Sequence, residues 1–595
     1  MCGIAGILTT CELPIEILSR KMQDALQHRG PDDQGIYISP EKQAGLIHTR
    51  LSILDLSPAG HQPMSAADDH YWIIFNGEIY NYQELRSQMQ SQGEIFQSQT
   101  DTEVILKLYQ KIGSDCVKYL RGMFAFAIWD DLKKTCFIAR DHLGIKPLYY
   151  CQSGSTLIFA SEVKAILACS LLTPTLNPQG LYGYLISGSV PEPHTLIEGI
   201  HCLKAGHWLY WKSGNLTQQQ YWQIDFICET ISQAEAAEKV RFALIDSIKS
   251  HFISDVPVGV FLSGGIDSST IVALGSQTQT EQLRTYSIAF EEQAWNESKI
   301  AEKVAQKFAT KHTEYMITAS LAQSLFSQFL STIDQPSIDG FNTFSVAQIA
   351  RNHGTKVVLS GLGGDELFNG YPSFQGVPQM MRWGQKFQAI KPLSSSIGMV
   401  LERWASSNQL KRLGDFLQQP PSTIAAYRSF RGIFSDWEAR QIAGLYLPEH
   451  TLKRQIEPSD FYSHLSLIDQ VSLLEISNYM RNQLLRDSDV MSMAWGLELR
   501  VPFVDRVLLE TISSLPSSIR LAPGKQLLIQ AVPELPTWVT NRPKQGFFFP
   551  FQSWLETEWR DYFPKINCPK NISLNNWYRR WSLAILQYWL EKNLP

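Results

Sequence analysis

The apolar pattern of this 595-residue chain changes near residue 211, and this change constrains the fold more than any other feature. The first 210 or so residues are mainly short apolar runs broken by Gly, Pro, Asn and Asp, which is typical of strands and turns. A helix is predicted among them over residues 101–112. The runs that predict strands lie at residues 71–75, 124–129, 135–139 and 157–160.

A polar stretch at residues 212–220 leads into a different pattern, in which strand-like and helix-like segments alternate. Alternation of this kind predicts a parallel sheet with helices on its faces. The chain is also too long for a single core. We therefore predict an α+β domain over residues 2–210 and an α/β domain over residues 235–595. The predicted strands of the second domain are residues 256–262, 283–290 and 356–360, and its helices include residues 236–248 and 299–310.

Composition limits the partners of the chain. Its net charge is -5 and its Lys and Arg residues are spread along the sequence, which argues against a nucleic-acid partner. No apolar run reaches the roughly 18–20 residues that span a bilayer, and no signal segment opens the chain. The nine cysteines, an odd number with no zinc-ligand spacing, indicate reduced thiols. We expect a cytoplasmic protein without a membrane partner.

Cys2 follows the initiator methionine, and this position permits a nucleophile that carries its own base. Methionine before a small residue is commonly removed, which would leave Cys2 with a free α-amine. Such an amine has a pKa near ~8 and can act as a general base at neutral pH. An isolated cysteine at position two would more often be an incidental thiol, so this interpretation depends on the segments that follow.

Polar residues downstream match the needs of amide hydrolysis. The Asn76 side chain and the Gly77 N–H can supply two donors to an oxyanion. A planar guanidinium at Arg50 suits the α-carboxylate of free glutamine, and the acid at Asp101 suits its α-ammonium group. Together with Cys2, these residues predict hydrolysis of the glutamine side-chain amide.

In their order along the chain, these segments resemble the class II glutamine amidotransferase domain, one of the N-terminal-nucleophile hydrolases. The resemblance covers roughly residues 2–210 and implies stacked antiparallel sheets with helices. It implies that Cys2 is the nucleophile, and that His28 and Arg29 hold a loop. It also implies an oxyanion hole at Asn76 and Gly77 and a glutamine pocket shaped by Arg50, Leu51, Ile53, Asn76, Gly77, Glu78 and Asp101.

A predicted strand runs directly into Ser263-Gly264-Gly265-Ile266-Asp267-Ser268-Ser269 at a predicted helix start. Converging backbone N–H groups and the helix dipole make such a turn an anion site. The chain has no GxxxxGK[ST] Walker loop, and the glycine spacing is not that of a dinucleotide-binding fingerprint. The segment resembles the PP-loop of enzymes that split ATP into AMP and pyrophosphate.

The PP-loop resemblance extends to a second glycine loop at residues 361–364 and implies a binding site for ATP with Mg²⁺. Asp267 and Asp365 are then hard oxygen ligands for the metal, although either alone could simply cap a helix. The residues that it implies for ATP binding are Leu262, Ser263, Gly264, Gly265, Asp267, Ser268, Ile288, Ser360 and Gly361.

Segments at residues 497–505, 524–528 and 542–547 extend the resemblance to the glutamine-hydrolysing asparagine synthetase family over nearly the whole chain. In that family the lysine matching Lys525 neutralises charge on the phosphates. The resemblance implies small-molecule substrates (glutamine, ATP and aspartate) and a possible homodimer. Aspartate would react with ATP to give an acyl-adenylate and pyrophosphate. Ammonia from Cys2 would then cross between the domains and displace AMP.

Leu362 departs from the family pattern, because asparagine synthetases usually carry Glu at this position of the second loop. Either Glu366 takes over, or the pocket accepts a different carboxylate. Residues 334–342 also resemble homologues that amidate uronic acids of surface polysaccharides. Aspartate is the first prediction for the acceptor, and a uronic acid of a nucleotide sugar or polysaccharide is the alternative.

Three other functions fit the residues less well. A PP-loop enzyme acting on tRNA would need a basic surface. A lactam-forming relative would have no use for an intact glutaminase. A non-catalytic module that senses glutamine would not need two complete sites.

Overall fold

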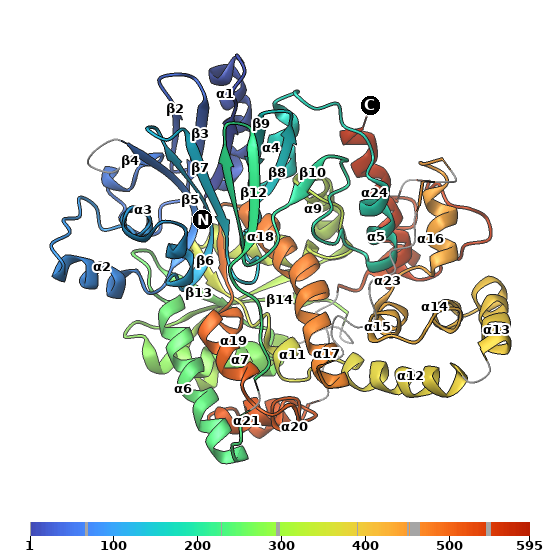
Figure 1. The fold of residues 1–595 in the computed structure, drawn as a ribbon. Coiled ribbons are helices and arrows are strands. Elements are labelled where there is room, and N and C mark those ends of the chain that lie inside the picture. Colours follow the sequence, from blue (N-terminus) through green and yellow to red (C-terminus); the bar gives the residue numbers. More distant parts are fainter. Residues whose placement is uncertain are drawn as a thin grey trace.

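The computed structural model describes most of the chain, and its two main parts are visible in Figure 1 as a blue-to-teal sheet region and a green-to-red helical region. The residues described are 2–65, 70–227, 229–292, 298–388, 391–448, 451–452, 464–542, 549–563 and 565–594. None of the helices in these ranges is long and apolar enough to cross a membrane.

The first part contains two six-stranded antiparallel sheets. One has the order β10-β8-β9-β1-β3-β2 and the other the order β12-β11-β7-β6-β5-β4. The strands of the first sheet are β1 (Gly3–Leu8), β2 (Asp33–Ile38), β3 (Ala44–Arg50), β8 (Tyr149–Ser153), β9 (Thr156–Ala160) and β10 (Ile200–Cys202). Those of the second are β4 (Met64–Ser65), β5 (Tyr71–Ile79), β6 (Gly122–Asp130), β7 (Thr135–Arg140), β11 (His207–Lys212) and β12 (Asn215–Gln220).

The two sheets pack face to face over one shared apolar core, to which β1, β3, β5, β6, β7, β9 and β11 all contribute buried residues. Helix α1 (Ile15–Leu26) contacts the first sheet at β1 and β3, and helix α3 (Asp101–Ile112) contacts the second sheet at β5. The predicted fold of stacked antiparallel sheets with helices is therefore confirmed.

The polar stretch at residues 212–220 was not among the predicted strands, yet most of it forms strand β12. β12 pairs with β11 at the edge of the second sheet, and nearly all of its side chains are exposed. A strand exposed on both faces shows no apolar alternation, so the period-two pattern that identifies strands was missing.

The second part is built on a parallel five-stranded sheet with the order β15-β14-β13-β16-β17, as predicted from the alternating pattern. Helices α6 and α7 contact each other, as do α10 and α18, and the two pairs contribute to the layers around the sheet. The strands are β13 (Val258–Phe261), β14 (Arg284–Phe290), β15 (Lys311–Ile317), β16 (Val357–Leu359) and β17 (Glu498–Arg500). The helices nearest them are α6 (Gln233–His251), α7 (Ile266–Thr278), α8 (Ser298–Lys307), α10 (Phe341–Asn352) and α18 (Arg486–Met493).

Helices also make up the rest of the second part. Residues 467–493 form one long helix, α17 (Leu467–Leu474) continuing into α18, and its middle turns (η5, Glu475–Leu485) are π-helical. The C-terminal helix α24 (Trp577–Asn593) lies beside α5 (Pro178–Ser187) of the first part (Figure 1), where the Tyr184 hydroxyl donates a 2.7 Å hydrogen bond to the Ser582 carbonyl. The other helices of this lobe are α12 (Ser373–Gln388), α13 (Lys391–Trp404), α14 (Asn408–Leu417), α15 (Thr423–Arg431) and α16 (Asp436–Ala443).

Candidate active sites

Cys2 stands at the start of β1, where the two antiparallel sheets bring it next to β5. The Cys2 nitrogen donates a 2.9 Å hydrogen bond to Oδ1 of Asn76. That nitrogen becomes the α-amine once Met1 is removed. Burial raises the pKa of the Cys2 thiol, so the thiol needs a base beside it to become a nucleophile. The neighbouring α-amine can supply that base.

Only one of the two polar atoms of the Asn76 side-chain amide has a hydrogen-bond partner among the described residues. Its Oδ1 atom accepts the hydrogen bond from Cys2, while its buried Nδ2 atom has no hydrogen-bond partner among the described residues. A buried donor without a partner costs about 1–3 kcal/mol, which an oxyanion at this point would relieve. Gly77, with a φ of +154°, has no room for a side chain, because a Cβ there would lie 2.0 Å from the Met123 carbonyl oxygen.

Arg50 and Asp101 lie at the ends of elements that converge on the same edge. The Arg50 guanidinium is held by backbone carbonyls of the following loop, with Nη2 2.6 Å from the Asp55 oxygen, and it has no carboxylate partner among the described residues. Asp101 is buried at the first turn of α3 and accepts a 2.9 Å hydrogen bond from the Ile79 N–H. A guanidinium without a carboxylate partner among the described residues, together with a buried carboxylate, suits the two charged groups of a free amino acid.

Leu51 and Ile53 place the proposed glutamine loop directly on the parallel sheet. Both side chains are buried, and they pack with Val357 of β16 in a small apolar cluster. The Asp255 N–H also donates to the Ile53 carbonyl at 3.1 Å. The loop that is predicted to bind glutamine is thus shaped in part by the second domain.

Glu78 makes an ion pair across the domains that the sequence did not reveal. Its Oε1 atom lies 3.1 Å from Nη2 of Arg500 on β17, and Arg500 also bonds Glu498 at 2.5 Å. Burial raises the pKa of Glu78, whereas Glu498 has its pKa lowered to about 2, because nearby positive charges, Arg500 among them, outweigh burial. Glu498 and Arg500 fall within a quoted family segment, but only the fold shows that they face the first site.

The Arg29 side chain links the Cys2 backbone to two carboxylates. Its Nε atom donates to the Cys2 carbonyl at 3.1 Å, Nη1 to Glu162 at 2.8 Å, and Nη2 to Asp489 of α18 at 2.7 Å. The side chain is fully buried. The expectation that Arg29 has a holding role agrees with these contacts, and Asp489 is an additional interface residue that the sequence did not indicate.

The buried carboxylate of Asp101 predicts a pH dependence. Burial raises its pKa to about 6. Asp101 is ionised above that value, and as the pH falls through 6 it gains a proton and loses its attraction for the ammonium group of glutamine. We expect kcat/KM for glutamine hydrolysis to fall about tenfold per pH unit below this point, since kcat/KM reports the free enzyme. A pH profile of glutamate release checks it, with Asp101→Asn expected to lack this inflection. An inflection near the ordinary value of about 4 would contradict the prediction.

The loop between β13 and α7 forms the turn that the sequence predicted. Gly264 has a φ of +79°, and the hydroxyls of Ser263 and Ser268 lie 3.2 Å apart across the turn. The second glycine loop comes close enough that a Cβ at Gly364 would lie 2.3 Å from Oδ1 of Asp267. Two loops that follow adjacent parallel strands therefore meet at the carboxyl end of the sheet, which is the usual ligand-binding edge of such sheets.

Lys525, Asp267 and Asp365 come together from three distant parts of the chain. The Lys525 Nζ atom lies 2.6 Å from Oδ2 of Asp267 and 2.5 Å from Oδ1 of Asp365. Burial works against its charge, but the two carboxylates outweigh burial and raise the pKa of Lys525. Lys525 itself has a φ of +58° at the start of helix α21 (Gln526–Ala531). This backbone strain indicates a constrained position.

The donor set fits Mg²⁺ bound through a nucleotide. Among the described residues no group of three or more metal-ligating side chains converges, and Asp267 and Asp365 are the acids next to the glycine loops. Mg²⁺ is usually held by one or two carboxylates together with substrate phosphates. The cationic Nζ atom of Lys525 between the two carboxylates shows that this point accepts positive charge.

Leu362 lies in the second glycine loop, and Glu366 lies in the short helix α11 (Gly364–Leu367) that follows it. Leu362 is half-buried against the apolar core, and Glu366 is buried and accepts a 2.8 Å hydrogen bond from the Tyr371 hydroxyl. Burial and the neighbouring Asp365 raise the pKa of Glu366 to about 7. Glu366 is therefore placed to exchange a proton near neutral pH.

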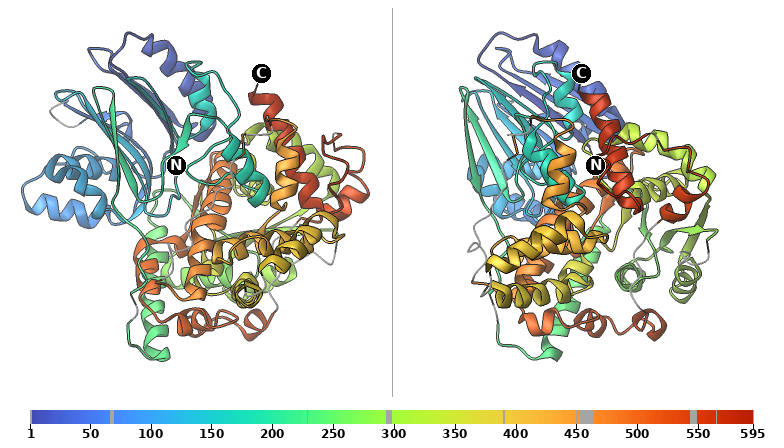
Figure 2. Two further views of the ribbon diagram at one scale, coloured as in Figure 1. Left: turned by 45° about the vertical axis from the view of Figure 1, so that its right-hand side comes forward. Right: turned by 90° about the vertical axis from the view of Figure 1, so that its right-hand side faces the viewer.

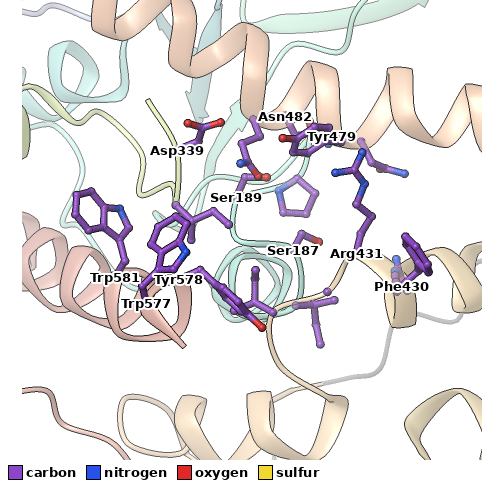
Figure 3. A pocket seen from close by; sticks show the side chains of 18 of the residues that line it. Ser187, Ser189, Asp339, Phe430, Arg431, Tyr479, Asn482, Trp577, Tyr578 and Trp581 are labelled. Atoms are coloured by element: carbon purple, nitrogen blue, oxygen red, sulfur yellow. The ribbon is translucent and has the colours of Figure 1, made fainter. Parts of the chain in front are cut away.

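A cavity of about 640 Å³ is lined by residues from both parts of the chain (Figure 3). Tyr479 and Arg431 belong to its wall, and both contact Tyr371, which in turn bonds Glu366. Tyr479 comes from the π-helical turns of η5, as do Asn482 and Gln483, and turns of this kind often occur at functional sites. In Figure 3, Trp577 and Trp581 lie at one end of the cavity and Arg431 lies toward the other.

Comparison with known proteins agrees with this pair of sites. The family model described as "Glutamine amidotransferase domain" matches residues 1–222, and the model "Asparagine synthase" matches residues 239–591. Asparagine synthetase [glutamine-hydrolyzing] 1 of Bacillus subtilis is 33% identical over 580 residues, which cover 95% of this chain and 90% of that protein. This chain belongs to the glutamine-hydrolysing asparagine synthetase family.

Two further relatives show how broad this similarity is. A putative asparagine synthetase of Methanocaldococcus jannaschii is 39% identical over 62% of this chain and 76% of its own length. A Gibberella zeae protein named amidase chry2 is 28% identical over 93% of this chain and 90% of its own length. Family membership makes the chain a glutamine-dependent ligase of the asparagine synthase type that uses ATP. The relatives differ in name, so the acceptor is a separate question.

Proposed function

We propose that this enzyme transfers the amide nitrogen of glutamine to an acceptor carboxylate that it first activates with ATP as an acyl-adenylate. The observation that carries the proposal is the convergence of Lys525, Asp267 and Asp365 where two glycine loops meet, in the same chain as the Cys2–Asn76 pair. The first group suits phosphates and the second suits amide hydrolysis. Mg²⁺ held by Asp267 and Asp365 would neutralise phosphate charge when bound.

In the first site, the Cys2 thiol gives its proton to the α-amine and its sulfur attacks the side-chain carbonyl of glutamine. Asn76 Nδ2 and the Gly77 N–H donate to the resulting oxyanion, which costs little reorganisation because both are already in place. As this intermediate collapses, its amide nitrogen takes up the proton from the α-amine and leaves as ammonia. Water then cleaves the thioester and releases glutamate. Arg50 and Asp101 hold the α-carboxylate and α-ammonium groups throughout.

In the second site, an oxygen of the acceptor carboxylate attacks the α-phosphorus of ATP and pyrophosphate leaves. Lys525 offsets the charge that builds on the phosphates. Ammonia then attacks the acyl carbon, AMP leaves, and the nitrogen gives up a proton. Glu366, with its pKa near 7, follows the second glycine loop in helix α11 and would take that proton.

Ammonia has to pass from Cys2 to the acyl-adenylate, and the contact between the domains supports a route inside the protein. Buried groups from both domains fill this contact, including the Leu51–Val357 packing and the Arg29–Asp489 ion pair. An enclosed route keeps ammonia concentrated and unprotonated.

Aspartate is the acceptor that family membership supports, and we propose L-asparagine as the product. A uronic acid is the second candidate, and the cavity walled by Tyr479 and Arg431 is large enough to hold it. A volume of about 640 Å³ is that of a site for a drug-sized ligand, far more than a small amino acid fills. Its lining combines aromatic rings such as Trp577 with polar groups such as Asp339 and Asn482, which suits a hydroxyl-bearing ring.

Leu362→Glu tests the acceptor. A carboxylate at this position could orient or deprotonate groups during adenylation, which leucine cannot do. We expect wild-type enzyme to release pyrophosphate with aspartate slowly, and Leu362→Glu to raise kcat/KM for aspartate by about tenfold or more. The measurement is aspartate-dependent pyrophosphate release.

Leu362→Gln is the matched control, because it has the shape of the glutamate variant without its charge, and it should not raise the rate. No release with aspartate from wild type or Leu362→Glu, together with release with a nucleotide-linked uronic acid, would overturn the aspartate assignment. The amidation mechanism itself would stand.

A further inference from the structure

Helix α13 (Lys391–Trp404) turns its large apolar residues away from the protein. Leu393, Ile397, Val400 and Trp404 are 57%, 44%, 59% and 82% exposed. Their spacing of four, three and four residues places them on a single face of the helix. An apolar stripe at this spacing normally faces a core, so its exposure needs a physical reason.

The packed face of α13 includes small residues and the buried Glu402 instead. Ser394 and Gly398 are buried on this side, and a Cβ at Gly398 would lie 2.7 Å from the Gly414 carbonyl oxygen of α14. The two helices therefore pack backbone against backbone through glycines. The arrangement reverses the ordinary amphipathic helix, and it leaves the apolar stripe available to something outside the chain.

Most of the exposed charges around this stripe are positive. Residues 373–420 contain six Lys and Arg residues and two acids, but Lys411 and Arg412 are buried, and Asp415 is half-buried. Of the two acids, Glu402 is buried and accepts hydrogen bonds from Gln418 and the Trp437 N–H. Arg382, Lys386 and Arg403 are exposed. The surface is thus apolar with a positive border.

The position of the helix also suits contact with a large surface. α13 lies at the outer end of the α12–α14 lobe, at the edge of the molecule in Figure 1, and the yellow helices of this lobe lie below the antiparallel sheets in both views of Figure 2. A second exposed tryptophan, Trp383, lies on the adjoining helix α12.

We propose that α13 docks the enzyme on an anionic lipid bilayer, with the helix in the plane of the interface. Leu393, Ile397, Val400 and Trp404 would enter the acyl-chain boundary, while Arg382, Lys386 and Arg403 meet lipid phosphates. Interfacial helices combine an aromatic and aliphatic face with basic residues in this way, and tryptophan favours the headgroup level. The expectation of no membrane partner rested on the absence of an apolar run long enough to span a bilayer. A helix that lies in the plane of the interface needs no such run, so that expectation does not test this proposal.

Charge favours a bilayer over a second copy of this chain. In a symmetric dimer the same surface meets itself. Arg382, Lys386 and Arg403 of one copy would then face the same cations of the other, and like charges in an interface are unfavourable. Anionic headgroups neutralise all of them.

Co-sedimentation of the full-length enzyme with vesicles tests the proposal. We expect binding to vesicles that contain phosphatidylglycerol as well as phosphatidylcholine, weaker binding to phosphatidylcholine alone, and a decrease with added salt. Ile397→Ser combined with Trp404→Ser should lower the vesicle-bound to free ratio at least about tenfold. Lys386→Gln combined with Arg403→Gln should remove most of the preference for the anionic vesicles.

Ile95→Ser combined with Leu132→Ser is the matched control, since these residues of the first domain are also apolar and exposed, and it should bind like wild type. All variants should keep full glutamine hydrolysis, which shows that they fold. Equal binding by wild type and Ile397→Ser/Trp404→Ser, or no binding by wild type, overturns the proposal. A dimer in sedimentation velocity that the same variant dissociates would instead identify a second copy as the occupant. The amidation proposal does not depend on either result.

Discussion

In Cys2→Ala enzyme, glutamine should no longer support amide formation, while added ammonia should support it at close to the wild-type rate. Only the first half-reaction uses the thiol, and loss of an activated nucleophile costs about 10⁵–10⁶ in kcat. The Lys525–Asp267–Asp365 cluster lies where the two glycine loops of the parallel sheet meet, whereas Cys2 lies at the start of β1 in the antiparallel sheets. Glutamate release and acceptor-dependent AMP formation, each measured with glutamine and with ammonium, separate the two sites.

Cys151→Ala is the matched control for this experiment. Cys151 is also a buried free thiol of the first domain, in β8 of the same sheet as β1, and its replacement should leave glutamine use unchanged. If glutamine supports Cys2→Ala as well as it supports wild type, the nucleophile has been assigned wrongly.

The second large effect is expected at Lys525. Turnover should yield AMP and pyrophosphate with little ADP. Lys525→Met should lower the rate of pyrophosphate release about 10³-fold, because a fixed positive group that stabilises the negative charge developing on a phosphate contributes a factor of this size in related sites. Asp267→Asn and Asp365→Asn should each cripple the same step. Phosphorus NMR identifies the products.

Two controls keep this result specific. Glutamine hydrolysis should survive in all three variants, because the first site has its own residues. Lys525→Arg keeps the charge between the carboxylates and should retain more activity than Lys525→Met. Stoichiometric ADP and orthophosphate from wild-type enzyme would refute the acyl-adenylate mechanism.

Local sequence signals predicted much of the fold. Strands β6 and β7 form where the sequence has buried apolar runs. Helix α3 forms where a periodic apolar pattern begins after Thr100, and the Thr100 hydroxyl accepts a hydrogen bond from the Glu103 N–H. The parallel sheet followed from alternation of strands and helices. β12 was missed because its side chains are exposed on both faces, so nothing in its composition distinguishes it from a polar loop.

The candidate sites also contain some features that local sequence predicted and others that it did not. The glycine turn at residues 263–265 is a local structure, and its position after β13 was predicted as such. The ion pair from Glu78 to Arg500 and the cavity walled by Tyr479 and Arg431 depend on residues that are far apart in the chain. No local pattern encodes such contacts, because they exist only when the two domains and the α12–α17 helices pack together. The Arg542–Phe547 segment, which completed the family resemblance, lies mostly outside the described residues.

By itself, the sequence determined that antiparallel sheets come first and a parallel sheet follows, and it predicted the residue types for the two proposed half-reactions. It did so because strand and helix periodicity, glycine turns and the position of Cys2 are local properties of the chain. Only the tertiary structure decided which charges face each other between the domains, that Lys525 lies between Asp267 and Asp365, and that α13 presents its apolar side to solvent. Packing over long sequence distances sets these features, and a helix with the pattern of α13 would, from its sequence alone, be placed against the core.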